Sequence, residues 1–187
     1  MTKIKLKPII RYYNNNIIEC VYNVDKNGNK QGLYERYHEN GQLDIKCTYK
    51  DGEYDGLYES YYENGQPCKK CTYKDGEYNG PEELYYENGQ LYIKSIHKDG
   101  KPEGQYEVYY DNGQLKEKCS YKNGKLDGPY KMFWDNAQLC IECSYKDGKI
   151  IDGTYRLYHK NGKTVKKAVD KSGVKLRTKE SFTRISI

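Results

Sequence analysis

The most constraining feature of this chain is a turn signal that recurs every 11 to 13 residues along most of its length. Glycine returns at a spacing of 24 residues, with one inserted residue before the last member: Gly32, Gly56, Gly80, Gly104, Gly128 and Gly153. A second turn signal follows each of these glycines, and its last residue lies nine positions after the glycine. It is Asn-Gly in all repeats but one: Asn40-Gly41, Asn64-Gly65, Asn88-Gly89, Asn112-Gly113, Asn136-Ala137 and Asn161-Gly162. A third signal completes each repeat: Asp51-Gly52, Asp75-Gly76, Asp99-Gly100, Asn123-Gly124, Asp147-Gly148 and Ser172-Gly173.

These dipeptides predict tight hairpin turns. Asn-Gly and Asp-Gly readily adopt the positive φ angles that a type I′ turn needs at both central positions. No stretch shows the apolar spacing of an amphipathic helix. We therefore predict an all-β fold, an elongated single-sheet antiparallel β-meander of stacked hairpin repeats with roughly 12–14 strands.

The charges support one register for these hairpins. If each Asn-Gly is a two-residue loop, Tyr37 faces Asp44 and Glu35 faces Lys46, and a Glu lies opposite a Lys in four successive repeats. In the fifth repeat both signs are exchanged together, as Lys131 and Glu142. Opposite charges across a strand pair are mutually stabilising, so a compensated exchange favours this register. The sixth repeat places Arg156 opposite Lys167, which predicts a frayed ladder or another partner for the arginine.

The same register sorts the side chains onto two faces, because alternate residues of a strand point to opposite sides. One face receives Tyr34 and its repeat equivalents opposite a column of cysteines such as Cys47. The other carries the Glu–Lys pairs and an aromatic column: Tyr37, Tyr61, Tyr85, Tyr109, Phe133 and Tyr158. The 23 tyrosines thus replace a missing aliphatic core, since a tyrosine covers apolar area while its hydroxyl stays wet. The mid-strand glycines predict a bent sheet.

Units such as Asp51–Gln66 (DGEYDGLYESYYENGQ) resemble the variant MORN repeat, in the form found in YwqK-type antitoxin proteins. The resemblance covers about residues 28–173 as six units, with Cys20-Val21-Tyr22 echoing the repeat before them. It implies a platform for partners, an association with membrane lipids and dimeric assembly. We divide the chain into a degenerate N-terminal repeat or cap (1–27), six repeats (28–173) and a basic C-terminal cap or tail (174–187).

Metal and catalytic chemistry find little support in the pattern. Cys68 and Cys71 resemble half of a zinc site, as do Cys140 and Cys143, but the two pairs are three repeats apart. An offset of three along a strand also predicts that each pair has its sulfurs on opposite faces. The three histidines occupy positions that hold an aromatic residue in other repeats. We therefore expect no metal, no cofactor and no enzymatic activity, and free cysteines in a reducing, cytoplasmic compartment (bacterial, or that of the host if the chain is viral).

The aromatic columns are the candidate binding site, because tyrosine and tryptophan anchors dominate interface energetics. We predict a scaffold that binds a protein partner through Tyr58, Tyr62, Tyr86, Tyr106, Tyr110, Tyr130, Met132, Trp134 and Tyr155. Positions that depart from the repeat, such as Glu82 and Pro67, would carry specificity. The packing of a thin sheet would also explain these columns. Masking of a toxin, glycan recognition and self-association through bare end strands remain open alternatives.

The charge distribution suggests a second contact. Residues 12–159 carry a net charge of −6, whereas residues 160–187 carry +7. A basic segment can bind an anionic lipid surface, and its candidate contacts are Lys163, Lys166, Lys167, Lys171, Lys175, Arg177 and Lys179. A solvated tail is the alternative. Nucleic acid is not expected along the acidic body, because duplex binding needs many cationic groups on one face. No run approaches the roughly 18 apolar residues of a membrane-spanning helix.

Overall fold

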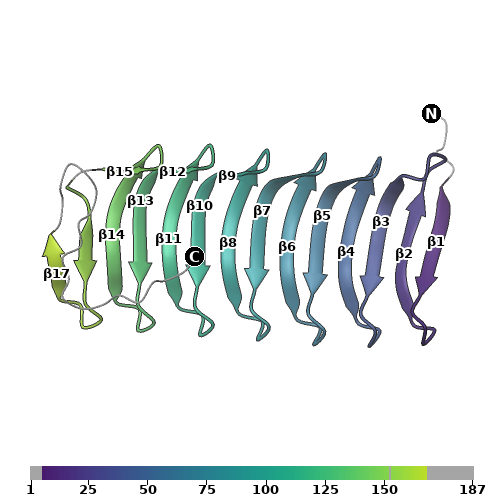
Figure 1. The fold of residues 1–187 in the computed structure, drawn as a ribbon, viewed down its shortest axis with the longest axis horizontal. Coiled ribbons are helices and arrows are strands. Elements are labelled where there is room, and N and C mark those ends of the chain that lie inside the picture. The colour runs from purple at the N-terminus through teal and green to yellow at the C-terminus, as the bar shows by residue number, and fades with distance from the viewer. Residues whose placement is uncertain (1–5, 152, 168–187) are drawn as a thin grey trace.

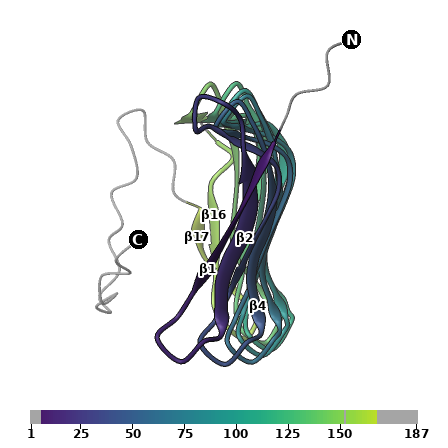
Figure 2. The ribbon, with the colours of Figure 1, turned by 90° about the vertical axis from the view of Figure 1, so that its right-hand side faces the viewer.

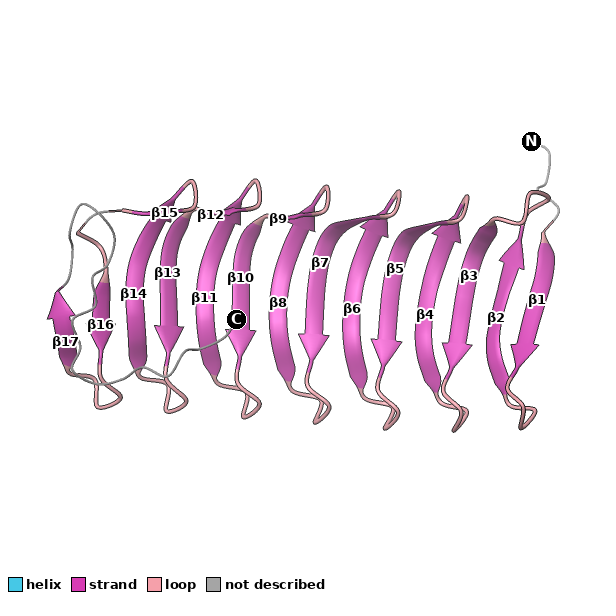
Figure 3. Cartoon of the chain, viewed as in Figure 1, coloured by secondary structure: helices cyan, strands magenta, loops and turns pink. Residues whose placement is uncertain are grey.

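The computed structural model describes residues 6–151 and 153–167, and these fold into one open antiparallel sheet of 17 strands (Figure 1). Successive strands pair as neighbours, so the sheet is a meander, and the described residues contain no helix (Figure 3). There is accordingly no helix among them that could cross a membrane. The prediction of an all-β, single-sheet meander is confirmed.

The strands follow the repeat. The first seven are β1 (Lys7–Tyr12), β2 (Ile18–Val24), β3 (Lys30–Tyr37), β4 (Leu43–Lys50), β5 (Glu53–Tyr61), β6 (Pro67–Lys74) and β7 (Glu77–Tyr85). The next five are β8 (Leu91–Lys98), β9 (Lys101–Pro102), β10 (Gly104–Tyr109), β11 (Leu115–Lys122) and β12 (Lys125–Leu126). The last five are β13 (Gly128–Phe133), β14 (Leu139–Lys146), β15 (Lys149–Ile150), β16 (Arg156–Tyr158) and β17 (Thr164–Lys167). The count exceeds the predicted 12–14 because three strands are each divided in two beside a repeat glycine.

The two ends of each hairpin use different turns. At the Asp-Gly end, Asp51 and Gly52 have φ angles of 53° and 90°, as a type I′ turn requires. At the Asn-Gly end, the His38 N–H donates to the Gln42 carbonyl at 2.8 Å, and only Gly41 has a positive φ. This loop has three residues and a bulge, so the type I′ prediction is confirmed at the first end and wrong at the second.

The bulge moves one residue of the returning strand out of the predicted register. Glu35 still pairs with Lys46, but Tyr37 pairs with Leu43, so the predicted Tyr37–Asp44 pair is wrong. The skipped residue turns to the face that carries Tyr34 and its equivalents: Tyr92 packs against Tyr86 with centroids 4.8 Å apart, and Asp44 pairs with Arg36. Because Cys68 and Cys140 are also skipped residues, the predicted placement of Cys68 and Cys71, and of Cys140 and Cys143, on opposite faces is wrong.

The repeat glycines bend the strands, and the sheet is curved when viewed end-on (Figure 2). Gly56 has a φ of 107°, and the Thr48 hydroxyl, which donates to the carbonyl of Asp55, would lie 2.5 Å from a Cβ added to Gly56. Gly128 meets the Ser120 hydroxyl in the same way, at 2.6 Å. No side chain larger than that of glycine fits at these two bends without a shift.

The sheet is a single layer, so its buried residues form one row along one face and not an interior between two layers. The buried residues of the described part of the chain all lie on one face: Cys20, Cys47, Cys71, Ser95, Val108, Cys119 and Cys143. We call this the tyrosine face, because tyrosines of the neighbouring strands cover these residues. The opposite side, which carries the Glu–Lys pairs, is the ladder face. Burial on a thin sheet therefore comes from the rings, as the tyrosine content predicts.

Candidate functional site on the tyrosine face

The tyrosine face is lined by a continuous row of rings from β2 to β8. Neighbouring centroids are 4.6–5.8 Å apart, the range in which aromatic pairs attract. The row runs through Tyr22, Tyr34, Tyr49, Tyr54, Tyr58, Tyr73 and Tyr78 and ends at His97. Beyond β8 the positions equivalent to Tyr54 and Tyr78 hold Pro102 and Leu126, and the rings form separate pairs, Tyr106–Tyr121 and Tyr130–Tyr145.

Four of the predicted site residues join consecutive repeats. The hydroxyls of Tyr62, Tyr86 and Tyr110 each donate to a backbone carbonyl of the next repeat at 2.7–2.8 Å. Trp134 does the same through its ring nitrogen, which lies 3.2 Å from the Tyr158 carbonyl. The polar ends of these side chains are therefore occupied within the protein, and their ring faces remain half-buried at one end of the tyrosine face.

The other predicted site residues lie on the same face, nearer the middle of the strands. Burial raises the pKa of Tyr58 and of Tyr106 to about 12, and it also raises that of Tyr130 and of Tyr155. Met132 pairs with Ile141 across the hairpin of β13 and β14. The structure thus brings all nine predicted residues onto one surface, which extends from β5 to the segment that precedes β16.

A polar cluster on β6, β7 and β8 interrupts this surface. The Lys69 ammonium lies 3.0 Å from the Glu82 carboxylate and 2.6 Å from the Tyr78 hydroxyl. The Ser95 hydroxyl donates to Glu82 at 3.1 Å, and the His97 Nδ1 lies 3.6 Å from the same carboxylate. The Ser95 side chain is buried and its Glu82 partner is already paired with Lys69, so no substrate can reach the serine oxygen and the cluster is not arranged as a nucleophile site.

The sequence pattern marks Glu82 as a departure from the repeat, but its contacts with Lys69 and Ser95 were not predicted. The signal was present in the register, because Glu82 and Ser95 are direct cross-strand partners. Glu82 stands where other repeats have Tyr, and Ser95 where they have Cys. The His97 Nδ1 is the one buried side-chain polar atom without a hydrogen-bond partner among the described residues.

A lysine also sits on the first part of the row. The Lys30 ammonium lies 4.4 Å from the Tyr34 centroid, 4.7 Å from that of Tyr49 and 5.4 Å from that of Tyr22. These separations are within the range of cation–π attraction. Lys30 occupies the repeat position of Tyr54 and Tyr78. The tyrosine face therefore accepts an ammonium group where the chain supplies one.

Glu117 is the acidic counterpart on the second half of the face. It lies on β11, opposite Val108 of β10 and Met132 of β13. Burial raises the pKa of Glu117 above its ordinary value, and hydrogen bonding from Tyr130 offsets part of that shift. The charge of the adjacent Lys116 also lowers the pKa of Glu117, but the Lys116 ammonium lies over the Tyr110 ring, 5.6 Å from the centroid, and forms no ion pair with the carboxylate. Glu117 is thus a half-buried carboxylate among aromatic rings.

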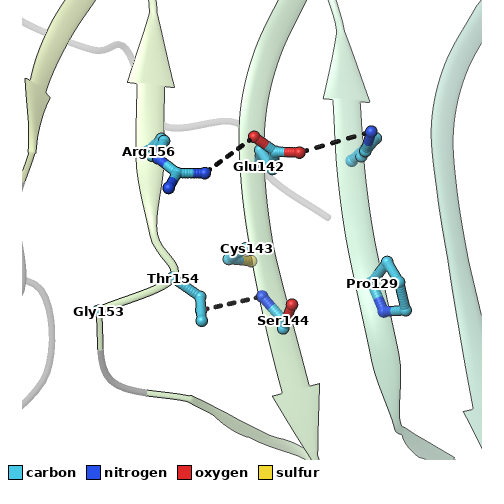
Figure 4. A pocket seen from close by; sticks show the side chains of 8 residues that line it. Pro129, Glu142, Cys143, Ser144, Gly153, Thr154 and Arg156 are labelled. Carbon is cyan, nitrogen blue, oxygen red and sulfur yellow. Dashed lines mark hydrogen bonds and ion pairs between the residues drawn. The ribbon is translucent and has the colours of Figure 1, made fainter.

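The ladder face bears out the charge register. Lys118 lies 2.8 Å from Glu107, and the exchanged pair, Lys131 and Glu142, is 3.4 Å apart. Arg156 is opposite Lys167 as predicted, and it finds another partner in Glu142 at 3.3 Å (Figure 4). Beside these residues is an open hollow of about 380 Å³ between β13, β14 and β16. Its charged lining groups are paired with one another, and the Thr154 hydroxyl is hydrogen-bonded to the backbone of Ser144 and Ile151.

The cysteines are free and most are inert. Burial raises the pKa of the Cys47 and Cys71 thiols to about 11 and that of Cys119 to about 12, which keeps them protonated. Within the described ranges, no three His, Cys, Asp or Glu side chains lie close enough together to hold a metal ion.

The predicted anionic-surface contacts fall mainly at the end of the chain. Lys163 is exposed in the loop before β17, and Lys166 and Lys167 belong to that strand. The remaining candidates, Lys171, Lys175, Arg177 and Lys179, lie outside the described residues, as do residues 174–187 as a whole.

Comparison with known proteins agrees with the fold. No curated protein matches the chain. The family model for the MORN repeat variant matches five tandem segments, residues 30–51, 54–75, 78–99, 102–123 and 126–147. Each segment begins near the Asp-Gly turn and covers one hairpin, so the matches coincide with the structural repeat. The chain therefore belongs to the MORN repeat variant family.

Proposed function

We propose that this chain is a non-enzymatic repeat scaffold that binds a protein partner through its tyrosine face. The observation that carries the proposal is the row of half-buried rings from Tyr22 to His97, over which the described residues place no second layer. Large, stiff aromatic side chains supply contact area at low entropic cost, and such anchors dominate protein interfaces. The ladder face is less suited, because its charges are already paired.

The shape of the molecule favours an extended partner over a small ligand. The hollows on the described surface are open and shallow rather than enclosed, whereas small-molecule sites are usually concave and bury most of the ligand. A sheet built from equal repeats presents similar rings at regular intervals. A protein segment that runs across several strands can contact many of them at once.

The experiment is affinity capture of the tagged full chain from its source cells, with two variants that the repeat itself shows to be tolerated. Tyr92→Lys changes the tyrosine face at a position that holds Lys116 in the next repeat. Leu57→Gln changes the ladder face at a 55% exposed leucine whose equivalent is Gln105. We expect a stoichiometric protein partner that is retained by Leu57→Gln and weakened by Tyr92→Lys.

The opposite pattern, loss with Leu57→Gln alone, would contradict the proposal and move the interface to the ladder face. Trp134→Tyr changes the predicted tryptophan anchor with little effect on the fold. Tyrosine occupies this position in other repeats, and its hydroxyl can donate a hydrogen bond to the backbone carbonyl of the next repeat. Masking of a toxin is the special case in which the captured partner is one small toxic protein. Recovery on anionic vesicles, independent of the tyrosine-face variants, would instead support the basic end of the chain as the contact.

A further inference from the structure

The tyrosine face holds three ammonium groups of its own, and each lies over a ring: Lys30, Lys69 and Lys116, the last at 5.6 Å from the Tyr110 centroid. Lys30 lies over Tyr34 and Tyr49 at 4.4 and 4.7 Å from the ring centroids. Lys69 lies over the Tyr78 ring at 4.6 Å and also pairs with the Glu82 carboxylate at 3.0 Å. A ring face and a carboxylate together form a site for an organic cation.

Glu117 occupies the repeat position of Lys69, two repeats further along the chain. The register places two rings diagonally across from it: Tyr106 lies two residues from its partner Val108 on β10, and Tyr130 lies two residues from its partner Met132 on β13. The rings are paired on either side, with centroids 5.5 Å apart in Tyr106–Tyr121 and in Tyr130–Tyr145. The second half of the face therefore has the carboxylate and the rings that surround a cation in the first half.

What differs is the cation. The nearby Lys116 lies over the Tyr110 ring and acts on Glu117 only through its charge, and no lysine, arginine or histidine among the described residues forms an ion pair with Glu117, whereas every Glu of the ladder pairs meets a lysine. Three other repeats hold isoleucine at this position, as Ile45, Ile93 and Ile141. A half-buried carboxylate costs stability unless a cation or a hydrogen-bond donor compensates for its lost hydration.

We propose that Glu117 and the neighbouring rings of Tyr106 and Tyr130 bind the ammonium or guanidinium group of a lysine or arginine side chain that a protein partner presents. The inference rests on the proposed function and names the chemistry of the partner at one point of the tyrosine face. Calcium and magnesium fit poorly, since they require six or more oxygen ligands and the site offers one carboxylate. Aromatic rings prefer the diffuse charge of an ammonium or guanidinium group.

The test is an NMR titration of the full chain with N-acetyl-lysine amide and N-acetyl-arginine amide. The neutral N-acetyl-norleucine amide is the control. We expect both cationic amides to shift backbone signals of β10, β11 and β13, and the norleucine amide to leave them unchanged. Glu117→Gln should weaken binding at least about tenfold, which corresponds to about 1.4 kcal/mol. Glu117→Ile introduces the isoleucine that other repeats hold at this position. It should abolish binding while the fold is retained.

Glu107→Gln is the matched control, because Glu107 lies on the neighbouring strand but faces the ladder side. Equal binding by wild type and Glu117→Gln, or no shift with either cationic amide, would overturn the inference. If Glu117→Gln shifts the signals of residues 168–187 with no amide added, the chain's own residues supply the cation. That result would overturn the partner as its source.

The two proposals fail separately. A captured partner that Tyr92→Lys loses and Glu117→Ile retains in full would leave the scaffold function standing and remove Glu117 from it. The chain could instead bind the amides and capture no protein. That result would overturn the scaffold function and the partner as the source of the cation. It would leave a site that binds free organic cations.

Discussion

The two halves of the tyrosine face are built from one repeat and yet pack their rings differently. From β2 to β8, rings contact across every strand, because Tyr54 and Tyr78 bridge one hairpin to the next. From β10 to β14 these bridges are absent, and Tyr106–Tyr121 and Tyr130–Tyr145 remain as separate pairs. The backbone repeat survives this change, so the bridging rings at the positions of Tyr54 and Tyr78 are not needed to define the fold. The first half is joined ring to ring across its strands, whereas the second half keeps its rings in separate pairs.

The largest effect should distinguish the halves through equivalent tyrosines. Tyr73 contacts three rings, whereas Tyr121 contacts only Tyr106 among the described residues. We expect Tyr73→Ala to cost about 3–5 kcal/mol in free energy of unfolding, as large-to-small substitutions in a core do. Tyr121→Ala should cost about 1–3 kcal/mol less, because two fewer aromatic pairs are lost. Urea denaturation of both variants measures the difference, and equal losses would contradict the comparison.

A second test concerns the position shared by Lys69 and Glu117. Lys69→Ile installs the residue of other repeats but leaves Glu82 without its cation, and we expect a loss of about 3 kcal/mol in unfolding free energy. Adding Glu82→Tyr restores the repeat residue on β7 and should recover most of that loss. Thermal denaturation of the single and double variants measures the coupling. No recovery in the double variant would show that the cluster does not act as a unit.

Much of the fold could be predicted because a register proposed for one repeat can be checked against the residues of every other repeat. The exchanged charges of Lys131 and Glu142 selected the register without any structure, and the register placed the faces. The Asn-Gly loop could not be predicted in detail, because the same dipeptide serves a two-residue type I′ turn and a three-residue loop with a bulge. That bulge turned Cys68 and Cys140 to the tyrosine face, and it made the predicted Tyr37–Asp44 pair wrong.

The candidate site was predicted as a surface but not as a set of contacts. Strand alternation places Tyr62 and Trp134 on the right face, yet it says nothing of where their polar atoms bond. The donor–acceptor links to the next repeat depend on the curvature of the sheet and on the loop geometry. The Lys69 cluster depends on three adjacent strands, so departures examined one at a time did not reveal it.

Titration should distinguish two glutamates on adjacent strands. Hydrogen bonds from Lys118 and Tyr109 lower the pKa of Glu107, so its contribution to stability is present above the unfolded pKa and is lost as pH falls through the folded value. Burial raises the pKa of Glu117, so its protonated form is favoured in the folded state, and stability is lost as pH rises through the folded value. Glu117→Gln should therefore gain stability relative to wild type at pH 7 more than at pH 4, and Glu107→Gln should do the reverse. Urea midpoints at the two pH values measure both, and parallel pH profiles would contradict the opposite signs.

The smallest expected effect exchanges one loop residue between the halves. Ala137 has a φ of 62° at the loop position where Gly41 has 83°, so alanine there adopts a left-handed conformation that glycine adopts freely. Ala137→Gly should stabilise the chain by about 0.5–1 kcal/mol, and Gly41→Ala should destabilise it by a similar amount. A Cβ added to Gly41 meets no atom within 4 Å, so a steric clash does not confound the comparison. Calorimetry of the two single variants and of the double exchange would show cancellation if backbone conformation alone sets the cost. A loss of stability on Ala137→Gly would mean that the alanine methyl group, beside the turn of Trp134, packs favourably where the glycines of the other loops leave space.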